Sequence, residues 1–277
     1  MMLDRKESSF LLIGIDFSAA NRAGSDIWLA CGLLNGDRLR VQSIFPAAQL
    51  TDPPAIQRQE ALPALVQYLI QHRPRAIGLD FPFGLPESLN PEHSLIALIQ
   101  NFSRYFPDLI AFERFRKQHC QWGEPKRLTD REARAPFSPL NLRVYRQTYF
   151  GIRDLLSPLL KTGRFCLPPI QPAIPQLGWL LEVCPASLLK KENLYQPYKG
   201  KSREHRTHRE AIVEHFLHQG IIQLDSPSLF QSMIADAKGN ALDSFLALWI
   251  TFQALREGKV ANPLTNATYL KEGIIFF

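Results

Sequence analysis

Leu11-Leu-Ile-Gly-Ile-Asp-Phe17 decides the fold, because it is a short apolar run that ends in an acid. A continuous apolar run of this length is typical of a strand buried on both faces. Asp16 would then lie at the carboxyl end of the strand, at the edge of a core. An isolated charge is costly there unless it is paired or bound to a metal ion. The stretch therefore predicts a buried strand that presents one acid.

Three further acids adjoin apolar runs. Asp80 follows Ile77-Gly-Leu, Glu182 follows Trp179-Leu-Leu, and Asp243 opens the stretch Asp-Ser-Phe-Leu-Ala-Leu that ends at residue 248. The first two runs are typical of strands, and the third is typical of a nearly all-apolar helix. Carboxylate oxygens are ligands that hard divalent cations prefer. Four acids gathered at one edge of a core would therefore form a divalent-metal site.

The segments nearest to the first strand predict a meander. Residues 26–34 and 38–45 have the character of two more strands, and Asn35-Gly36 between them is a strong hairpin signal. Apolar residues recur at helical spacing over 54–71, and residues 75–81 form a fourth strand that ends before a proline.

Residues 87–175 are predicted to be a mostly helical insertion within one domain that spans residues 1–277. Its middle part, 119–139, is polar, basic and interrupted by prolines, while helical spacing is found on both sides of it. Beyond the insertion the pattern predicts a fifth strand at 177–184, helices at 202–219 and 241–257, and a short strand or hairpin within 267–277.

This order of elements is that of a ribonuclease-H-like sheet. We therefore expect an α/β fold with a mixed five-stranded sheet, made of three antiparallel meander strands plus two parallel strands and flanked by helices. In such a sheet the first strand is central, and ligands gather at the carboxyl ends of the parallel strands. Asp16, Asp80 and Glu182 each lie at or near such an end.

The chain has a net charge of +6, and its positive charge is concentrated in two segments. Residues 190–209 hold seven Lys or Arg against two acids, and residues 112–134 hold seven against four. Such segments can follow a phosphate backbone, and neighbouring aromatic rings can stack on bases. A nucleic-acid partner, DNA or RNA, is therefore plausible, although two solvated surfaces would give the same pattern. The interleaved aromatic residues are Tyr195, Tyr198, Phe112, Phe115 and Trp122.

Other features bear on the compartment. No run of 18 apolar residues occurs, so we expect no membrane-spanning helix and no membrane partner. The polar N-terminus argues against a secretory signal. Four widely separated cysteines without a C-x-x-C pair favour a reducing, cytoplasmic environment. The oligomeric state is left open.

The chain resembles the family known as domain of unknown function 429, which is described as predicted nucleases with a ribonuclease-H-like fold. The resemblance implies that Asp16, Asp80, Glu182 and Asp243 form an acidic metal site. The matching pieces run in the family's order: Gly-Ile-Asp at 14–16, Gly-Leu-Asp-Phe-Pro-Phe-Gly-Leu-Pro at 78–86, Glu-Val-Cys-Pro-Ala at 182–186, a basic segment at 198–209, and Ala-Leu-Asp-Ser-Phe-Leu-Ala-Leu at 241–248.

The expected chemistry is phosphodiester hydrolysis with two divalent ions, Mg²⁺ or Mn²⁺, about 3.5–4 Å apart. Asp16 would bridge the ions because the first strand is central, Asp80 and Glu182 would each hold one ion, and Asp243 would complete the shell. Lysine and arginine side chains would bind the substrate phosphates. The candidates for that role are Lys199, Lys201, Arg206 and Arg209.

Each acid also has a simpler explanation. Asp16 and Asp80 could hydrogen-bond the turns that follow their strands. Glu182 could pair with a buried arginine, and Asp243 could stabilise the helix N-terminus in a capping box with Asn240. Two other functions are compatible with the pattern. They are a non-catalytic nucleic-acid-binding protein of the same fold, and an actin-like ATPase or phosphotransferase.

Overall fold

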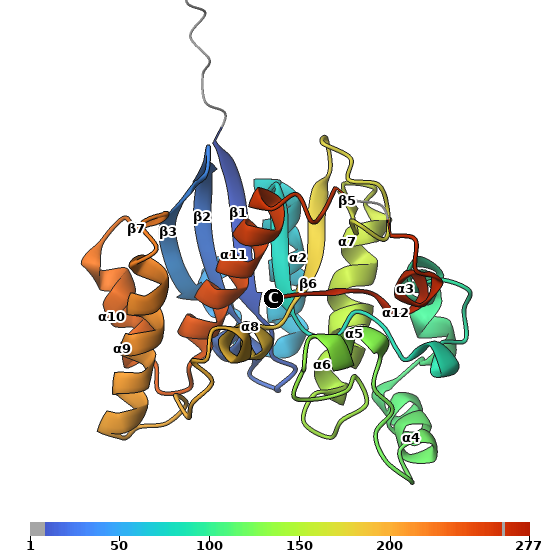
Figure 1. The fold of residues 1–277 in the computed structure, drawn as a ribbon. Coiled ribbons are helices and arrows are strands. Elements are labelled where there is room, and N and C mark those ends of the chain that lie inside the picture. Colours follow the sequence, from blue (N-terminus) through green and yellow to red (C-terminus); the bar gives the residue numbers. More distant parts are fainter. Residues whose placement is uncertain (1–8, 262–263) are drawn as a thin grey trace, which may run out of the picture.

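The computed structural model describes residues 9–261 and 264–277, which form a mixed sheet with helices on both faces (Figure 1). Seven strands lie in the order β5-β6-β4-β1-β2-β3-β7, and an eighth, β8, pairs with β6. Their bounds are β1 Phe10–Asp16, β2 Trp28–Asn35, β3 Arg38–Pro46, β4 Ala76–Asp80, β5 Phe165–Cys166, β6 Gly178–Val183, β7 Ile222–Leu224 and β8 Ile275–Phe276.

β1 lies between an antiparallel neighbour, β2, and a parallel neighbour, β4. β2 and β3 form the expected hairpin, in which Asn35 pairs with Arg38. Gly36 has a φ of 60° at this turn, a conformation that glycine adopts without steric cost. On the other side, β6 extends the parallel part of the sheet beyond β4. The predicted meander and the two predicted parallel strands are thus present.

The expectation of five strands was wrong, because the sheet has eight. The additional strands, β5, β7 and β8, have only two or three residues each. Such short segments have no measurable hydrophobic periodicity, and their pairing depends on distant parts of the chain. The segment expected as a short strand or hairpin within 267–277 contains a helix, α12 (Ala267–Glu272), followed by β8.

The two faces of the sheet are covered by different parts of the chain. Alternate residues of a strand point to opposite faces, so Leu12 contributes to one core while Ile13 and Ile15 contribute to another. Helix α11 (Asn240–Arg256) covers the Leu12 face and is drawn in front of β1 in Figure 1. The other helices of this face are α8 (Pro185–Lys191), α9 (Arg203–Leu217) and α10 (Pro227–Ala235).

Helix α2 (Arg58–His72) and the insertion cover the opposite face. The insertion is mostly helical, as expected, and its polar middle part contains a short helix. Phe112 is fully buried here, so its ring is not available to stack on a base, while Phe115 is partly buried against the same core. The helices of the insertion are α3 (Leu95–Tyr105), α4 (Leu109–His119), α5 (Leu128–Glu132), α6 (Tyr145–Gly151), the π-helical turn η3 (Ile152–Leu156) and α7 (Ser157–Lys161).

Glycines let α11 pack closely on the two strands that carry the first two acids. Gly14 of β1 and Gly78 of β4 are opposite each other in the parallel register. A Cβ atom on Gly14 would lie 2.0 Å from the backbone nitrogen of Leu248, and one on Gly78 would lie 2.1 Å from Oγ1 of Thr251. No side chain fits at such distances. The two glycines therefore allow α11 to pack directly against β1 and β4, and this close packing places Asp243 near the ends of the two strands.

Candidate functional site

Asp16 and Asp80 end two adjacent parallel strands at the same level. They are partners in the register of β1 and β4, two residues beyond the glycine pair at 14 and 78. Because side-chain direction alternates along a strand, both acids point to the face that α11 covers. Each keeps part of its surface exposed at the end of its strand.

Asp243 joins these two acids from the first turn of α11 and is buried. The predicted capping box with Asn240 is not formed, because Asn240 lies inside the helix and its amide donates to the carbonyl of Asp26. Asp236 instead accepts hydrogen bonds from the backbone N–H groups of Lys238 and Ala241. The Asp243 carboxylate is therefore not used to cap the helix.

Two side chains from the segment between α8 and α9 contact Asp243. The Tyr198 hydroxyl donates to Oδ1 over 2.6 Å, and the Lys199 ammonium lies 2.6 Å from Oδ2. Lys199 is half exposed, whereas Tyr198 is buried. Lys199 was expected to hold a substrate phosphate, and the structure shows it paired with a candidate metal ligand.

The pKa values of the two strand-end acids reflect burial first and repulsion between the acids second. Burial, followed by repulsion from Asp243, raises the pKa of Asp16 well above its usual value, and Lys199 opposes this shift. Burial and the same neighbour raise the pKa of Asp80 to about 8. The three carboxylates together outweigh burial and raise the pKa of Lys199. One ammonium group therefore does not compensate three adjacent acids.

Glu182 lies on the other face of the sheet. It is the register partner of Leu79, not of Asp80, so the alternation of side chains directs it away from α11. There it forms a buried ion pair with Arg127 of the insertion, whose Nη1 is 2.8 Å from Oε2. The backbone N–H of Phe83 also donates to Oε2 over 3.0 Å. The structure thus brings together Asp16, Asp80 and Asp243, whereas Glu182 lines the same cavity but is paired with Arg127.

Of the other predicted phosphate ligands, Arg209 is engaged within the fold, while Lys201 and Arg206 lie on the surface. Arg209 is buried, and its guanidinium donates to the carbonyls of Ile234 and Gly200 and to that of Tyr198. It therefore holds the segment that carries Lys199 in place and has no exposed surface for a phosphate. Arg206 is exposed and pairs with Glu210 on the same helix, and Lys201 is exposed on the adjoining loop.

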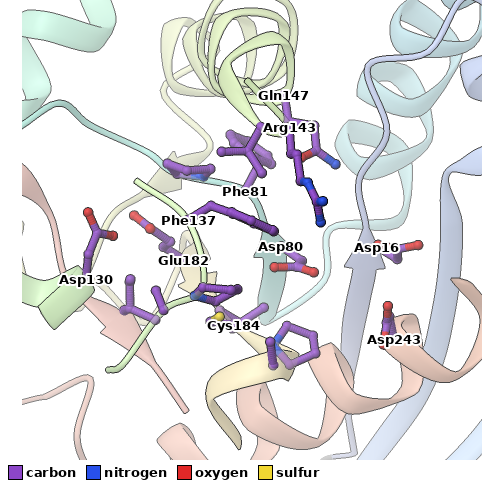
Figure 2. A pocket seen from close by; sticks show the side chains of 18 of the residues that line it. Asp16, Asp80, Phe81, Asp130, Phe137, Arg143, Gln147, Glu182, Cys184 and Asp243 are labelled. Carbon is purple, nitrogen blue, oxygen red and sulfur yellow. The ribbon is translucent and has the colours of Figure 1, made fainter. Parts of the chain in front are cut away.

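A cavity of about 610 Å³ opens above the three aspartates (Figure 2). Its walls come from the insertion on one side and from residues 195–199 on the other. Sequence reasoning missed the insertion residues Phe137, Arg143 and Gln147. Their segment shows no strand end or acid, so the only available signal was that basic and aromatic residues occur close together there. Of the aromatic rings expected to stack on bases, Tyr195 and Tyr198 line the cavity, while Trp122 is almost fully exposed elsewhere.

The donor atoms fit Mg²⁺ or Mn²⁺ better than a softer ion such as Zn²⁺ or Cu²⁺, since they are carboxylate oxygens. With the side chains as placed, residues 9–261 and 264–277 contain no group of three or more His, Cys, Asp or Glu arranged to hold one ion. The Lys199 ammonium is paired with the Asp243 carboxylate, which a bound metal ion would also need as a ligand. Metal binding at this site therefore requires the exposed end of Lys199 to move.

Comparisons with family models, with curated proteins and with solved structures found no match to this chain. Within the described part of the chain, no helix is long and apolar enough to cross a membrane. The cysteines at positions 31, 120, 166 and 184 are free thiols.

Proposed function

We propose that the protein is a metal-dependent phosphodiesterase that acts on nucleic acid, with Asp16, Asp80 and Asp243 as the metal ligands. One observation carries the proposal. Three carboxylates from β1, β4 and α11 converge beneath one cavity, and the Lys199 ammonium is paired with one of them. Burial and, after it, repulsion from Asp243 raise the pKa values of Asp16 and Asp80, and a divalent cation, Mg²⁺ or Mn²⁺, would stabilise the charged form of both acids.

The order of the central strands supports a ribonuclease-H-like assignment. The order β3-β2-β1-β4-β6 has the first strand in the middle, the hairpin on one side and the parallel strands on the other. This is the arrangement expected for that fold and for the resemblance to domain of unknown function 429. Both remain part of the proposal, as does a cytoplasmic location.

Each residue would have a defined task. Asp16, Asp80 and Asp243 would hold the cation, the first two from the ends of adjacent strands and the third from the first turn of α11. The cation would supply an activated water and stabilise the leaving oxygen. Lys199 would leave Asp243 and bind the anionic substrate as a point charge. Glu182 would stabilise the fold through Arg127 and would not take part in the reaction.

The proposal is tested by a calorimetric titration with Mn²⁺. We expect saturable binding in the wild type, loss of binding in Asp80→Asn, and about tenfold tighter binding in Lys199→Met, because the methionine removes a competing positive charge. Asp225→Asn is the matched control: Asp225 follows β7, pairs with Arg40 and lies outside the cavity. Absence of Mn²⁺ binding in the wild type would contradict the proposal.

One observation favours the second candidate, a nucleic-acid-binding protein without catalysis. The Lys199 ammonium already occupies Asp243, as it would in a protein whose acids no longer bind metal. Cleavage assays on labelled single-stranded and duplex oligonucleotides with Mn²⁺ distinguish the two. Turnover by the wild type and its loss in Asp16→Asn support the enzyme, while salt-sensitive binding without turnover or metal dependence supports the second candidate.

A further inference from the structure

The wall opposite the aspartates contains a cation that the proposed metal chemistry does not use. Arg143 is exposed, lines the cavity and makes no ion pair within the described residues. Figure 2 shows its side chain directed from the insertion toward the space above Asp80 and Asp16. A guanidinium here faces the acidic floor across the cavity, at a position suited to an anion held between them.

The backbone around Arg143 is anchored on both sides. Its own N–H donates to the side chain of Asn141 over 2.8 Å. Four residues later, the Gln147 amide donates to the backbone carbonyl of Phe17, just past the end of β1, over 2.7 Å. The insertion is therefore fixed to the strand that carries Asp16.

An aromatic ring lies beside the guanidinium. The Phe137 ring centroid is 5.4 Å from Cζ of Arg143, within the range of a cation–π contact. Phe137 is partly exposed, lines the cavity and does not belong to the buried cores of the sheet. A second exposed ring, Tyr195, lines the cavity from the segment that carries Lys199. Aromatic rings that line a charged cavity are suited to stacking on bases.

The dimensions limit what can enter. A volume of about 610 Å³ is within the range of sites that take small molecules and one or two nucleotide units. A paired base can reach the floor only if it is first extruded from the duplex, which has an energetic cost. An unpaired nucleotide has no such cost, and its base has free faces for Phe137 and Tyr195.

We infer that the substrate is single-stranded nucleic acid, with Arg143 holding the phosphate opposite the aspartates and Phe137 stacking on an adjacent base. This inference rests on the proposed function for the reaction, but the specificity follows from the insertion. Phosphate contact by Arg143 is independent of sequence, and stacking tolerates every base. The site would therefore select for strandedness and not for base identity.

Fluorescence anisotropy with short labelled oligonucleotides tests the inference without requiring turnover. Single-stranded DNA, single-stranded RNA and a DNA duplex of the same sequence are compared at one salt concentration, with Ca²⁺ present. We expect both single strands to bind about tenfold more tightly than the duplex. Arg143→Ala and Phe137→Ala should each weaken single-strand binding about tenfold. Arg146→Ala is the matched control, because Arg146 is an exposed arginine in α6 that lies outside the cavity.

Equal affinity for the duplex, or equal effects of Arg143→Ala and Arg146→Ala, would overturn the inference. These results leave the proposed function intact if Mn²⁺ still binds the aspartates and duplex is cleaved. Conversely, failure to bind Mn²⁺ would end the proposed function without changing a measured preference for single strands.

Discussion

The substitution Glu182→Gln tests whether Glu182 stabilises the fold through Arg127 or binds the metal ion. Arg127 is fully buried and donates from two guanidinium nitrogens to the two oxygens of Glu182. Gln has one oxygen, so one nitrogen of Arg127 would face the amide NH₂ group, and a charge-assisted hydrogen bond would be lost. Such a bond contributes about 1.5–3 kcal/mol, and the buried guanidinium also loses half of its neutralising charge, since only Asp130 remains.

We therefore expect Glu182→Gln to lower the free energy of unfolding by about 3 kcal/mol, within the cost of breaking a buried ion pair. For a chain of this size, that corresponds to a fall of about 5–10 °C in Tm. Mn²⁺ affinity should stay within about twofold of the wild type, because Arg127 already engages both oxygens of the Glu182 carboxylate. Urea unfolding followed by circular dichroism measures the first quantity, and calorimetry measures the second.

The reverse pattern would refute this reasoning. If Glu182→Gln were as stable as the wild type but bound Mn²⁺ about 100-fold more weakly, Glu182 would be a metal ligand and its ion pair would be secondary. Arg127→Met provides a second test, since it leaves both Glu182 and Asp130 without their buried cation. It should cost at least as much stability as Glu182→Gln, again without loss of Mn²⁺ affinity.

Three further predictions concern the site and its supports. Gly14→Ala should destabilise the protein by at least about 3 kcal/mol, because the added Cβ would lie 2.0 Å from the backbone nitrogen of Leu248. Urea unfolding measures this loss of stability. A change under about 1 kcal/mol would show that α11 can shift to make room for the methyl group. The raised pKa of Asp80 means that the folded protein keeps a proton that the unfolded chain has lost, so this residue reduces stability as pH rises from about 4 to about 8. Asp80→Asn should accordingly be more stable than the wild type by about 2 kcal/mol at pH 8 and by much less at pH 5. Unfolding curves recorded without metal at the two pH values measure this difference. A larger difference at pH 5 than at pH 8 would contradict the raised pKa of Asp80. Arg209→Gln should loosen the segment that carries Lys199, since it removes donors to three backbone carbonyls. It should increase amide hydrogen exchange at residues 198–200, and unchanged exchange would show that other contacts hold the segment.

The sequence predicts most of the fold because its strands are strongly apolar and end in recognisable signals. The hairpin at Asn35-Gly36, the strand ends at Asp16 and Asp80, and the apolar helix of Asp243 all have local causes. β7 and β8 have none, since strands of two or three residues exist only through their partners. Their pairing with β3 and β6 joins segments far apart in the chain.

The sequence predicts which acids lie at strand ends, but it does not predict to which face of the sheet the Glu182 side chain points. In Trp179-Leu-Leu-Glu-Val183 nearly every neighbour of Glu182 is apolar, so no alternation indicates which face the acid takes. Its partner Arg127 is 55 residues away in a segment that reads as polar. The contacts of Lys199 and Arg209 likewise depend on how the segment after α8 crosses the end of the sheet, which no local pattern shows.

Anomalous diffraction from crystals soaked in Mn²⁺ tests the central claim most directly. We expect density between the carboxylates of Asp16 and Asp80, within coordination distance of Asp243, with the Lys199 side chain moved off that acid. Clear maps with no anomalous peak at these aspartates, and with Lys199 still paired to Asp243, would contradict the claim that they form a divalent-metal site.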